Sequence, residues 1–136
     1  NILSATYPGV HTHLPHFGRS GYRTVVVTTR PSSRSGPVME LPFARWIDHF
    51  VWGDTVPAAK PAPDGLVSAL AHFNAAKGVY VGDNPHDMAA AHACPKPVQS
   101  VAALWGALEA DKLLASAPNQ SFATFGEFAN WALTLD

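Results

Sequence analysis

The chain has 136 residues, enough for one domain and too few for two. Its 9 basic and 10 acidic residues give a formal net charge of −1, which argues against nucleic-acid binding because nucleic-acid binders carry a basic excess. No apolar run reaches the ~18 residues that a membrane span needs, no signal peptide is visible, and Cys94 has no second cysteine to pair with. These features predict a cytoplasmic protein that binds neither nucleic acid nor a membrane.

The composition is unusual in its low charge. Apolar residues make up 47% of the chain, which is enough to fill a core. Charged residues make up only 14%, against about 25% in an ordinary soluble domain. A chain with so few charges has difficulty covering its own surface. We therefore expect it either to pack against more protein or to be a piece of something larger.

Five strands are predicted in chain order. Residues 24–28 form a β-branched run without alternation, which is typical of a strand buried on both faces in a parallel sheet. The other strands are expected at residues 50–52, 79–81, 98–101 and 122–124.

Helical patterns alternate with these strands. A helix is expected to begin at residue 63, with Leu66, Leu70 and Phe73 along its apolar face. Two more helices are predicted at residues 85–92 and 125–133.

Two segments have a poor helical pattern or none. Residues 10–17 make a poor helix because Pro15 would lie inside it, where proline lacks a backbone N–H. Residues 31–37 are rich in Ser, Gly and Pro and are expected to form a loop.

The alternation of strands and helices predicts an α/β fold with a parallel sheet, organised as one domain over residues 1–136. In such sheets, ligands bind outside the carboxyl ends of the strands. Polar residues follow the first three predicted strands at Thr28, Asp54 and Asp83. We therefore expect these residues to share one edge of the sheet.

Two carboxylates at that edge suggest a metal site. Asp83 and Asp87 are four residues apart at a strand-to-helix turn, and on a helix this spacing points both side chains the same way. Like charges so placed repel unless a cation lies between them, and Mg²⁺ is a usual one. The alternative is that Asp83 caps the helix and Asp87 is a solvated surface residue.

Lys60 and Thr28 are two further candidates. Lys60 lies between Ala59 and Pro61, which restrict its backbone, and its ammonium could be held against an anion. The alternative for Lys60 is a surface lysine in a Pro-rich turn. Thr28 ends the buried strand with a hydroxyl and backbone N–H groups that could face a ligand, or it simply terminates the strand.

The order of these motifs is more specific than any one of them. A threonine follows an apolar strand, the segment Lys60-Pro61-Ala62-Pro63-Asp64 comes next, and Gly82-Asp83 is then followed by Asp87. This order resembles the haloacid dehalogenase (HAD) superfamily of phosphohydrolases, especially its phosphoglycolate-phosphatase-like members, over almost the whole chain. The resemblance implies a Rossmann-like, HAD-type three-layer sandwich. It also implies a Mg²⁺-dependent phosphomonoester hydrolase that acts on a small phosphorylated metabolite.

The resemblance gives particular residues a role. Thr28 would hydrogen-bond the transferring phosphoryl group, and Lys60 would neutralise charge between that group and the nucleophile. Asp83, with help from Asp87, would hold Mg²⁺. Such a cluster suits phosphoryl transfer, where positioning and charge neutralisation do most of the catalysis.

Two further residues are expected on the substrate side, and the chain departs from the family near one of them. Thr29 and His86 would lie near the substrate, but Thr29 stands where the family commonly has Asn. Pro95 stands where the family usually has Gly after the Ala-rich helix. Because proline cannot adopt the left-handed cap that glycine can, the chain must leave that helix in another way.

One part of the family pattern is missing. The family's nucleophile is the first Asp of an Asp-x-Asp-Gly-Thr segment, and no two aspartates of this chain are separated by one residue. The strand that carries this segment would lie between the strands ending at Thr28 and Gly82. Either the nucleophilic Asp and its strand come from outside this chain, or the sheet is remodelled so that those two strands pair directly. We favour the first interpretation and expect the chain alone to be inactive.

Other interpretations stay open. A non-catalytic HAD-like module that binds phosphate or a partner would also lack the nucleophile. A receiver-like or flavodoxin-like α/β domain fits the alternation but leaves the segment around Lys60 unexplained. Low charge and open strand edges favour self-association or pairing with the missing amino-terminal segment.

Overall fold

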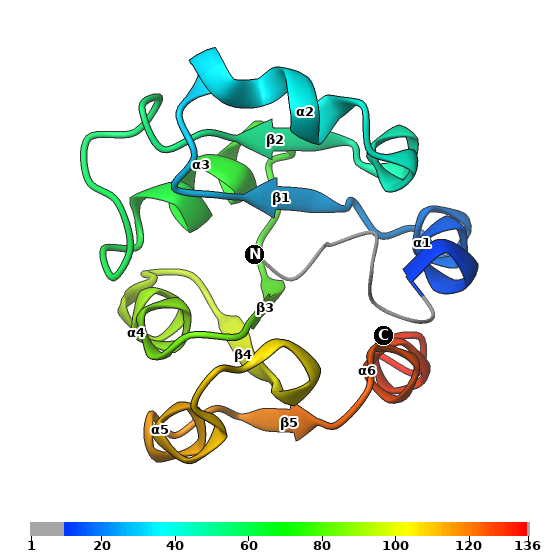
Figure 1. Cartoon of the computed structure of the whole chain (residues 1–136), viewed down its shortest axis with the longest axis vertical. Coiled ribbons are helices and arrows are strands. Elements are labelled where there is room, and N and C mark those ends of the chain that lie inside the picture. Colours follow the sequence, from blue (N-terminus) through cyan, green and yellow to red (C-terminus); the bar gives the residue numbers. More distant parts are fainter. Residues whose placement is uncertain (1–9, 136) are drawn as a thin grey trace.

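The computed structural model describes residues 10–135, which form two parallel sheets flanked by helices (Figure 1). The first sheet pairs β1 (Val25–Val27) with β2 (His49–Val51). The second contains β3 (Gly78–Gly82), β4 (Val98–Ala103) and β5 (Gln120–Phe122), with β4 in the middle. The α-helices are α1 (Val10–Arg19), α2 (Ser35–Met39), α3 (Asp64–His72), α4 (Pro85–Ala93), α5 (Ala110–Ala115) and α6 (Phe125–Ala132).

Every strand pairing in these sheets is parallel. Val26 lies opposite Phe50 in the first sheet, and Val81 lies opposite Val101 in the second. All five predicted strands are present, with ends shifted by at most two residues. The predicted parallel α/β fold is therefore confirmed.

Helices cover the two faces of the strands and bury a separate core on each. Figure 1 shows α1 and α6 on one side of the strands and α3, α4 and α5 on the other. The core on the α1 and α6 side contains Phe17, Val26, Val81, Phe125 and Phe128 together with other buried residues, so it joins both sheets. On the opposite side, α3 and α4 pack their apolar residues against the strands in a smaller cluster. This is the three-layer arrangement that the sequence predicts.

Side chains at the helix ends explain where two of the helices begin. Asn84 precedes α4 and accepts a hydrogen bond from the backbone N of His86, while Asp87 accepts one from the backbone N of Asn84. Thr124 precedes α6 and accepts a hydrogen bond from the backbone N of Glu127 at 3.1 Å. Such caps satisfy backbone N–H groups that have no partner within the helix.

The two segments with a poor helical pattern or none both contain helices. Pro15 lies inside α1, but Leu14 and Phe17 are buried in the core beside it, and this packing offsets the lost hydrogen bond. Residues 31–37 were expected to form a loop, yet a 3-10 helix covers Ser32–Arg34 and α2 begins at Ser35. Pro37 falls in the first turn of α2, where its missing backbone N–H breaks no hydrogen bond within the helix. Val38 is buried, and its packing stabilises this turn.

β1 and β3 belong to different sheets, so the strands ending near Thr28 and Gly82 do not pair directly. A cavity of about 630 Å³ separates them and is lined by residues of both strands and of the surrounding helices. We call it the inter-sheet cavity. Within residues 10–135, the alternative of a remodelled sheet is therefore wrong.

None of the helices between residues 10 and 135 has both the length and the apolar composition needed to cross a membrane.

Candidate active site

Thr28 stands at the carboxyl end of β1, where the chain turns sharply. Its backbone N donates to the carbonyl oxygen of Val51 at 3.0 Å, which continues the pairing with β2. Its hydroxyl accepts a hydrogen bond from the backbone N of Arg30 at 3.1 Å. A hydroxyl has two lone pairs and one proton, so this bond leaves the proton for a ligand oxygen.

Gly53 lets the end of β2 approach this turn closely. A Cβ added at Gly53 would lie 2.2 Å from the carbonyl oxygen of Thr29, a distance that no side chain tolerates. The backbone N of Gly53 donates to the carbonyl oxygen of Arg30 at 2.9 Å. Glycine at this position therefore fixes the backbone of Thr28 and Thr29 against β2.

Lys60 reaches from the segment after β2 to the end of β3. Its Nζ lies 2.7 Å from Oδ1 of Asp87 and 3.0 Å from the hydroxyl of Tyr80. The side chains of Lys60 and Asp87 are 14% and 5% exposed, so this is a nearly buried ion pair. The interpretation of Lys60 as a surface lysine is therefore wrong.

The electrostatics of this group keep the lysine charged. Burial by itself would lower the pKa of Lys60, but Tyr80 and the Asp87 carboxylate outweigh burial and raise that pKa above its ordinary value of 10.5. Burial, reinforced by the negative charge of Asp87, raises the pKa of Tyr80 to about 12. At neutral pH Lys60 is therefore an ammonium and Tyr80 a protonated phenol.

Asp87 has two tasks in this arrangement. Oδ1 accepts from Lys60, and Oδ2 accepts from the backbone N of Asn84 at 3.2 Å, which stabilises the start of α4. The side chain packs on Gly82, because a Cβ added there would lie 2.2 Å from the Cβ of Asp87. With 3% of its surface exposed, Asp87 is not the solvated residue of the alternative interpretation, and Asn84 rather than Asp83 caps the helix.

Asp83 and His86 lie in the turn between β3 and the start of α4. Asp83 directly follows Gly82 and is half-buried, whereas His86 is exposed. Nothing in the structure tests whether His86 or Thr29 contacts a substrate, and both roles stay predictions.

Mg²⁺ was expected between Asp83 and Asp87. The side chains at this place can be compared with the ligands that Mg²⁺ needs. Between residues 10 and 135, no group of three or more His, Cys, Asp or Glu side chains is arranged to hold a metal ion. Asp87 is bonded to Lys60, and Asp83 is the other carboxylate of the pair at this turn. Mg²⁺ is usually held by one or two carboxylates together with water and phosphate oxygens. The residues fit Mg²⁺ only if further oxygen ligands come from elsewhere.

Three of the predicted residues lie together at one edge. Thr28, Thr29 and Lys60 line a single small depression of about 10 Å³, room for one water-sized group. Through Lys60, this depression is joined to Asp87 and hence to the end of β3.

Tyr80 is the residue of this group that the sequence analysis did not single out. Its position inside an apolar strand suggested packing alone, and its side chain does contribute to the core under α3 and α4. The alternation of side chains along β3 places Tyr80 and Gly82 on the same face, beneath Asp87. That alternation, combined with the Gly-Asp motif, was the signal that could have identified it.

A parallel α/β sheet with polar residues at its carboxyl edge defines the class of Rossmann-like proteins that bind ligands outside the ends of their strands. Within that class, this chain belongs to the haloacid dehalogenase-like hydrolase family, which matches residues 3–101.

Its relatives include named phosphatases. The chain is 37% identical over 99 residues to the protein called "phosphoglycolate phosphatase, plasmid" of Cupriavidus necator, a match that covers 71% of this chain and 43% of that protein. It is 36% identical over 93 residues to a phosphoglycolate phosphatase of Nitrosococcus oceani, with 66% and 41% covered. The chain thus spans less than half the length of these relatives.

Solved structures share the fold. A haloacid dehalogenase-like family hydrolase of Streptococcus pneumoniae superposes with a TM-score of 0.76 at 23% identity, over 93% of this chain and 59% of that one. At that level of identity the likeness concerns the fold alone.

Proposed function

We propose that this chain forms part of a Mg²⁺-dependent phosphomonoester hydrolase of the phosphoglycolate-phosphatase-like type, whose nucleophilic Asp is supplied from outside residues 1–136. The substrate would be a small phosphorylated metabolite in the cytoplasm. Because two relatives are named phosphoglycolate phosphatases, phosphoglycolate is the first ester to test.

The observation that carries the proposal is the position of Lys60. Its ammonium lies within hydrogen-bond distance of Tyr80 and Asp87, and Lys60 is also one of the residues that line the depression beside Thr28 and Thr29. A phosphate ester at this edge would meet a fixed positive charge from Lys60 and a hydroxyl donor from Thr28. Hydrogen bonds to charged groups contribute about 1.5–3 kcal/mol each, so these two side chains suffice to orient the ester.

Mg²⁺ would be held in part by Asp83, and when bound it would neutralise charge on the phosphate oxygens. The chain's own residues would do the rest of the positioning. Asp87 keeps Lys60 pointing toward the edge, and Gly53 keeps the turn at Thr28 in place.

Phosphate binding and turnover test the proposal separately. Inorganic phosphate is titrated into the chain by calorimetry in the presence of Mg²⁺, and Lys60→Ala or Thr28→Val should weaken binding by about tenfold or more. Lys112→Ala is the control, because Lys112 forms an exposed pair with Glu109. Equal binding by Lys60→Ala and the wild type would contradict the assigned site.

Turnover is measured with an aryl phosphate and Mg²⁺. The chain alone should show none. Turnover that disappears in Lys60→Ala would show that the nucleophile lies within residues 1–136, and it would refute that part of the proposal. The Lys60 variant is needed because a contaminating phosphatase would not respond to it.

A non-catalytic phosphate-binding module is the second candidate. It is favoured by the lack of an Asp-x-Asp pair in the chain. Such a module would bind phosphate through Lys60 and Thr28 but would gain no turnover when a strand carrying Asp-x-Asp is supplied.

A further inference from the structure

Trp52 is a large aromatic residue at the edge that carries the candidate active site. It directly follows β2, is half-buried, and lines the small depression together with Thr28, Thr29 and Lys60. Burial of an aromatic ring is among the largest favourable contributions that a side chain makes, so an indole that stays partly exposed still has apolar surface to offer a ligand. No part of the proposed function uses it.

The pairing of the first two strands makes Trp52 the neighbour of Thr28. Val27 lies opposite Val51. The backbone N of Thr28 donates to the carbonyl oxygen of Val51 at 3.0 Å, so the parallel pairing continues one residue beyond β1. The next pair in this register is Thr28 and Trp52, at the spacing of about 4.8 Å between neighbouring strands.

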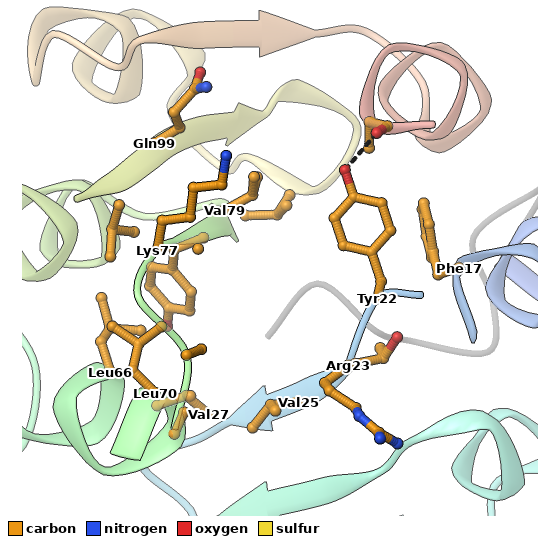
Figure 2. A pocket seen from close by; sticks show the side chains of 18 of the residues that line it. Phe17, Tyr22, Arg23, Val25, Val27, Leu66, Leu70, Lys77, Val79 and Gln99 are labelled. Atoms are coloured by element: carbon orange, nitrogen blue, oxygen red, sulfur yellow. Dashed lines mark hydrogen bonds between the residues drawn. The ribbon is translucent and has the colours of Figure 1, made fainter. Parts of the chain in front are cut away.

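The side chains of Thr28 and Trp52 lie on the same face of the first sheet. Val27 packs against the core cluster of Leu66, and Figure 2 shows both residues lining the inter-sheet cavity. Val27 therefore points toward α3. Because side chains alternate along a strand, Thr28 points the other way, toward α1, and its partner across the pairing shares that face. The indole is thus on the same side of the sheet as the hydroxyl that is proposed to hold the phosphoryl group.

The indole is held in place from within the protein. Its ring is stacked on that of Phe50, with centroids 5.3 Å apart and planes inclined by 6°. Phe50 in turn packs against the core cluster that contains Val26 and Phe17. The backbone N and the hydroxyl of Thr55 both donate to the carbonyl oxygen of Trp52, at 3.1 and 2.8 Å, which fixes the turn after β2. A ligand that contacts this ring therefore loses little binding free energy to ordering it.

The segment between β2 and Lys60 lines the depression with apolar residues. Besides Trp52 and Gly53, it contributes Val56, Ala58 and Ala59. The depression has room for one water-sized group, and the organic part of a phosphate ester is larger than that. If the phosphate of such an ester is held by Thr28 and Lys60, its organic part must lie outside the depression. Trp52 is the largest apolar side chain among the lining residues, so it offers that part the most contact.

We infer that Trp52 is a specificity-determining residue that binds the organic part of the substrate and favours phosphate esters whose alcohol part contains a ring. The face of an arene, or the C–H face of a sugar ring, covers an indole well, whereas a short acyclic chain such as that of phosphoglycolate covers little of it. The inference rests on the proposed function for the position of the phosphate. Trp52 takes no part in the transfer itself.

The ring preference is measured by calorimetry on the full 136-residue chain with Mg²⁺. Phenyl phosphate should bind about tenfold more tightly than methyl phosphate, and Trp52→Leu should remove this difference. Trp52→Phe keeps an aromatic ring and should retain part of it. Glucose 6-phosphate is titrated in parallel, and the ester whose affinity falls more in Trp52→Leu identifies the kind of ring that the site takes.

Trp46 provides the matched control. It is 36% exposed, the guanidinium of Arg45 lies 4.8 Å from its ring centroid, and it is not among the residues that line the depression. Trp46→Leu removes an aromatic ring at another place, so it should leave the preference for phenyl phosphate unchanged. A preference that falls equally in both variants would overturn the inference.

Nuclear magnetic resonance of the indole N–H groups gives a position-specific readout. The chain has 4 tryptophans, and the indole signal that is missing from Trp52→Phe belongs to Trp52. Phenyl phosphate should shift this signal, and methyl phosphate should shift it much less. Equal shifts by both esters, or an equal shift of the Trp46 signal, would contradict the proposed contact. Because these spectra are recorded on the wild-type chain, they decide the question even if Trp52→Leu fails to fold.

The outcomes separate this inference from the proposed function. A ring preference that depends on Trp52, together with weaker binding of both esters in Lys60→Ala, supports both. Binding that is weaker in Lys60→Ala but shows no preference for the ring supports the phosphate site and refutes the role of Trp52. Equal losses for the two esters in Trp52→Leu would mean that this residue supports the turn at Thr28 instead of the ring, and the inference would again be wrong. If neither ester binds, the proposed function fails and the inference fails with it.

Discussion

The two sheets differ in how completely their strands are packed. In the three-stranded sheet, the central strand β4 is closed on both edges, and Val101, Ala102 and Ala103 have no exposed surface. In the two-stranded sheet, Val26 is the one buried residue of β1. Its neighbours Val25 and Val27 remain partly exposed beside the inter-sheet cavity. A β-branched run therefore does not secure burial by itself; it needs a neighbouring strand on each side.

Side chains from several elements join the two sheets. Phe125 and Phe128 of α6 pack in one core cluster with Phe17 and Val26, and Lys60 bonds across to Asp87. If these contacts hold the two sheets together, substitutions in them should lower the free energy of unfolding more than substitutions within either sheet.

The largest effect on stability is expected at the aromatic contacts between α6 and α1. Phe125 is 1% exposed and touches the rings of Phe17, Phe128 and Trp105, so Phe125→Ala should lower the free energy of unfolding by about 3–5 kcal/mol. Urea denaturation measures the change. Phe122→Ala, which removes a half-buried ring of β5, is the control and should cost less than half as much. Equal losses would mean that these contacts are no more important than the edge of the sheet.

The ion pair that joins the sheets comes next. Lys60→Met leaves the Asp87 carboxylate buried without its cation and should cost about 3 kcal/mol in urea denaturation at pH 7. In the matched control, Lys112→Met breaks an exposed pair with Glu109 and should change stability by less than about 0.5 kcal/mol. The comparison fails if the two substitutions have the same effect.

A smaller effect is expected inside the three-stranded sheet. Ser100 is fully buried and bonds to His92 and to the side chain and backbone of Asn119, so it links β4 to α4 and to the turn before β5. Ser100→Ala removes a hydroxyl from this network and should cost about 1–2 kcal/mol. Ser121→Ala, at an exposed position of β5, should stay within about 0.5 kcal/mol of the wild type.

The smallest effect concerns pH and the two-stranded sheet. The rings of His49 and His72 stack with centroids 3.7 Å apart. Burial, and then the charge of His72, lowers the pKa of His49 below its ordinary value of 6.5. The unfolded chain therefore takes up this proton first, so the contribution of His49 is complete above pH 6.5 and is lost as the pH falls through the folded-state pKa.

Thermal unfolding between pH 7.5 and pH 5 checks this dependence. His49→Gln should flatten the fall of Tm with decreasing pH, and His72→Gln should flatten it in part, because burial of His49 remains. An unchanged pH profile in His49→Gln would exclude this residue as the cause.

The fold could be predicted largely because its pattern is local. Two strands can be recognised from the sequence because each is an apolar run between turn residues, namely Val25–Val27 and Gly78–Gly82. The helix around Pro15 could not be predicted in this way. It is stabilised by the burial of Leu14 and Phe17 against α6, a contact that neighbouring residues in the sequence do not reveal.

The site was predictable in part for the same reason. The edge shared by Thr28 and Lys60 follows from the rule that ligands bind at strand ends, and both do line one depression. The bond between Lys60 and Asp87 joins residues 27 positions apart, and the motif around Asp87 suggested a metal instead. Spacing along the chain reports which carboxylates are near each other, but it does not report which cation reaches them.

The hydroxyl of Tyr22 donates to the carbonyl oxygen of Ala132 at 2.6 Å, across 110 positions of the chain. A ribosome adding about 5–20 residues per second makes that acceptor roughly 5–20 s after the tyrosine. Throughout that interval the aromatic side chains of the first half lack the final helix against which they close. Until that helix has been made, those side chains lack the cover that the folded structure gives them.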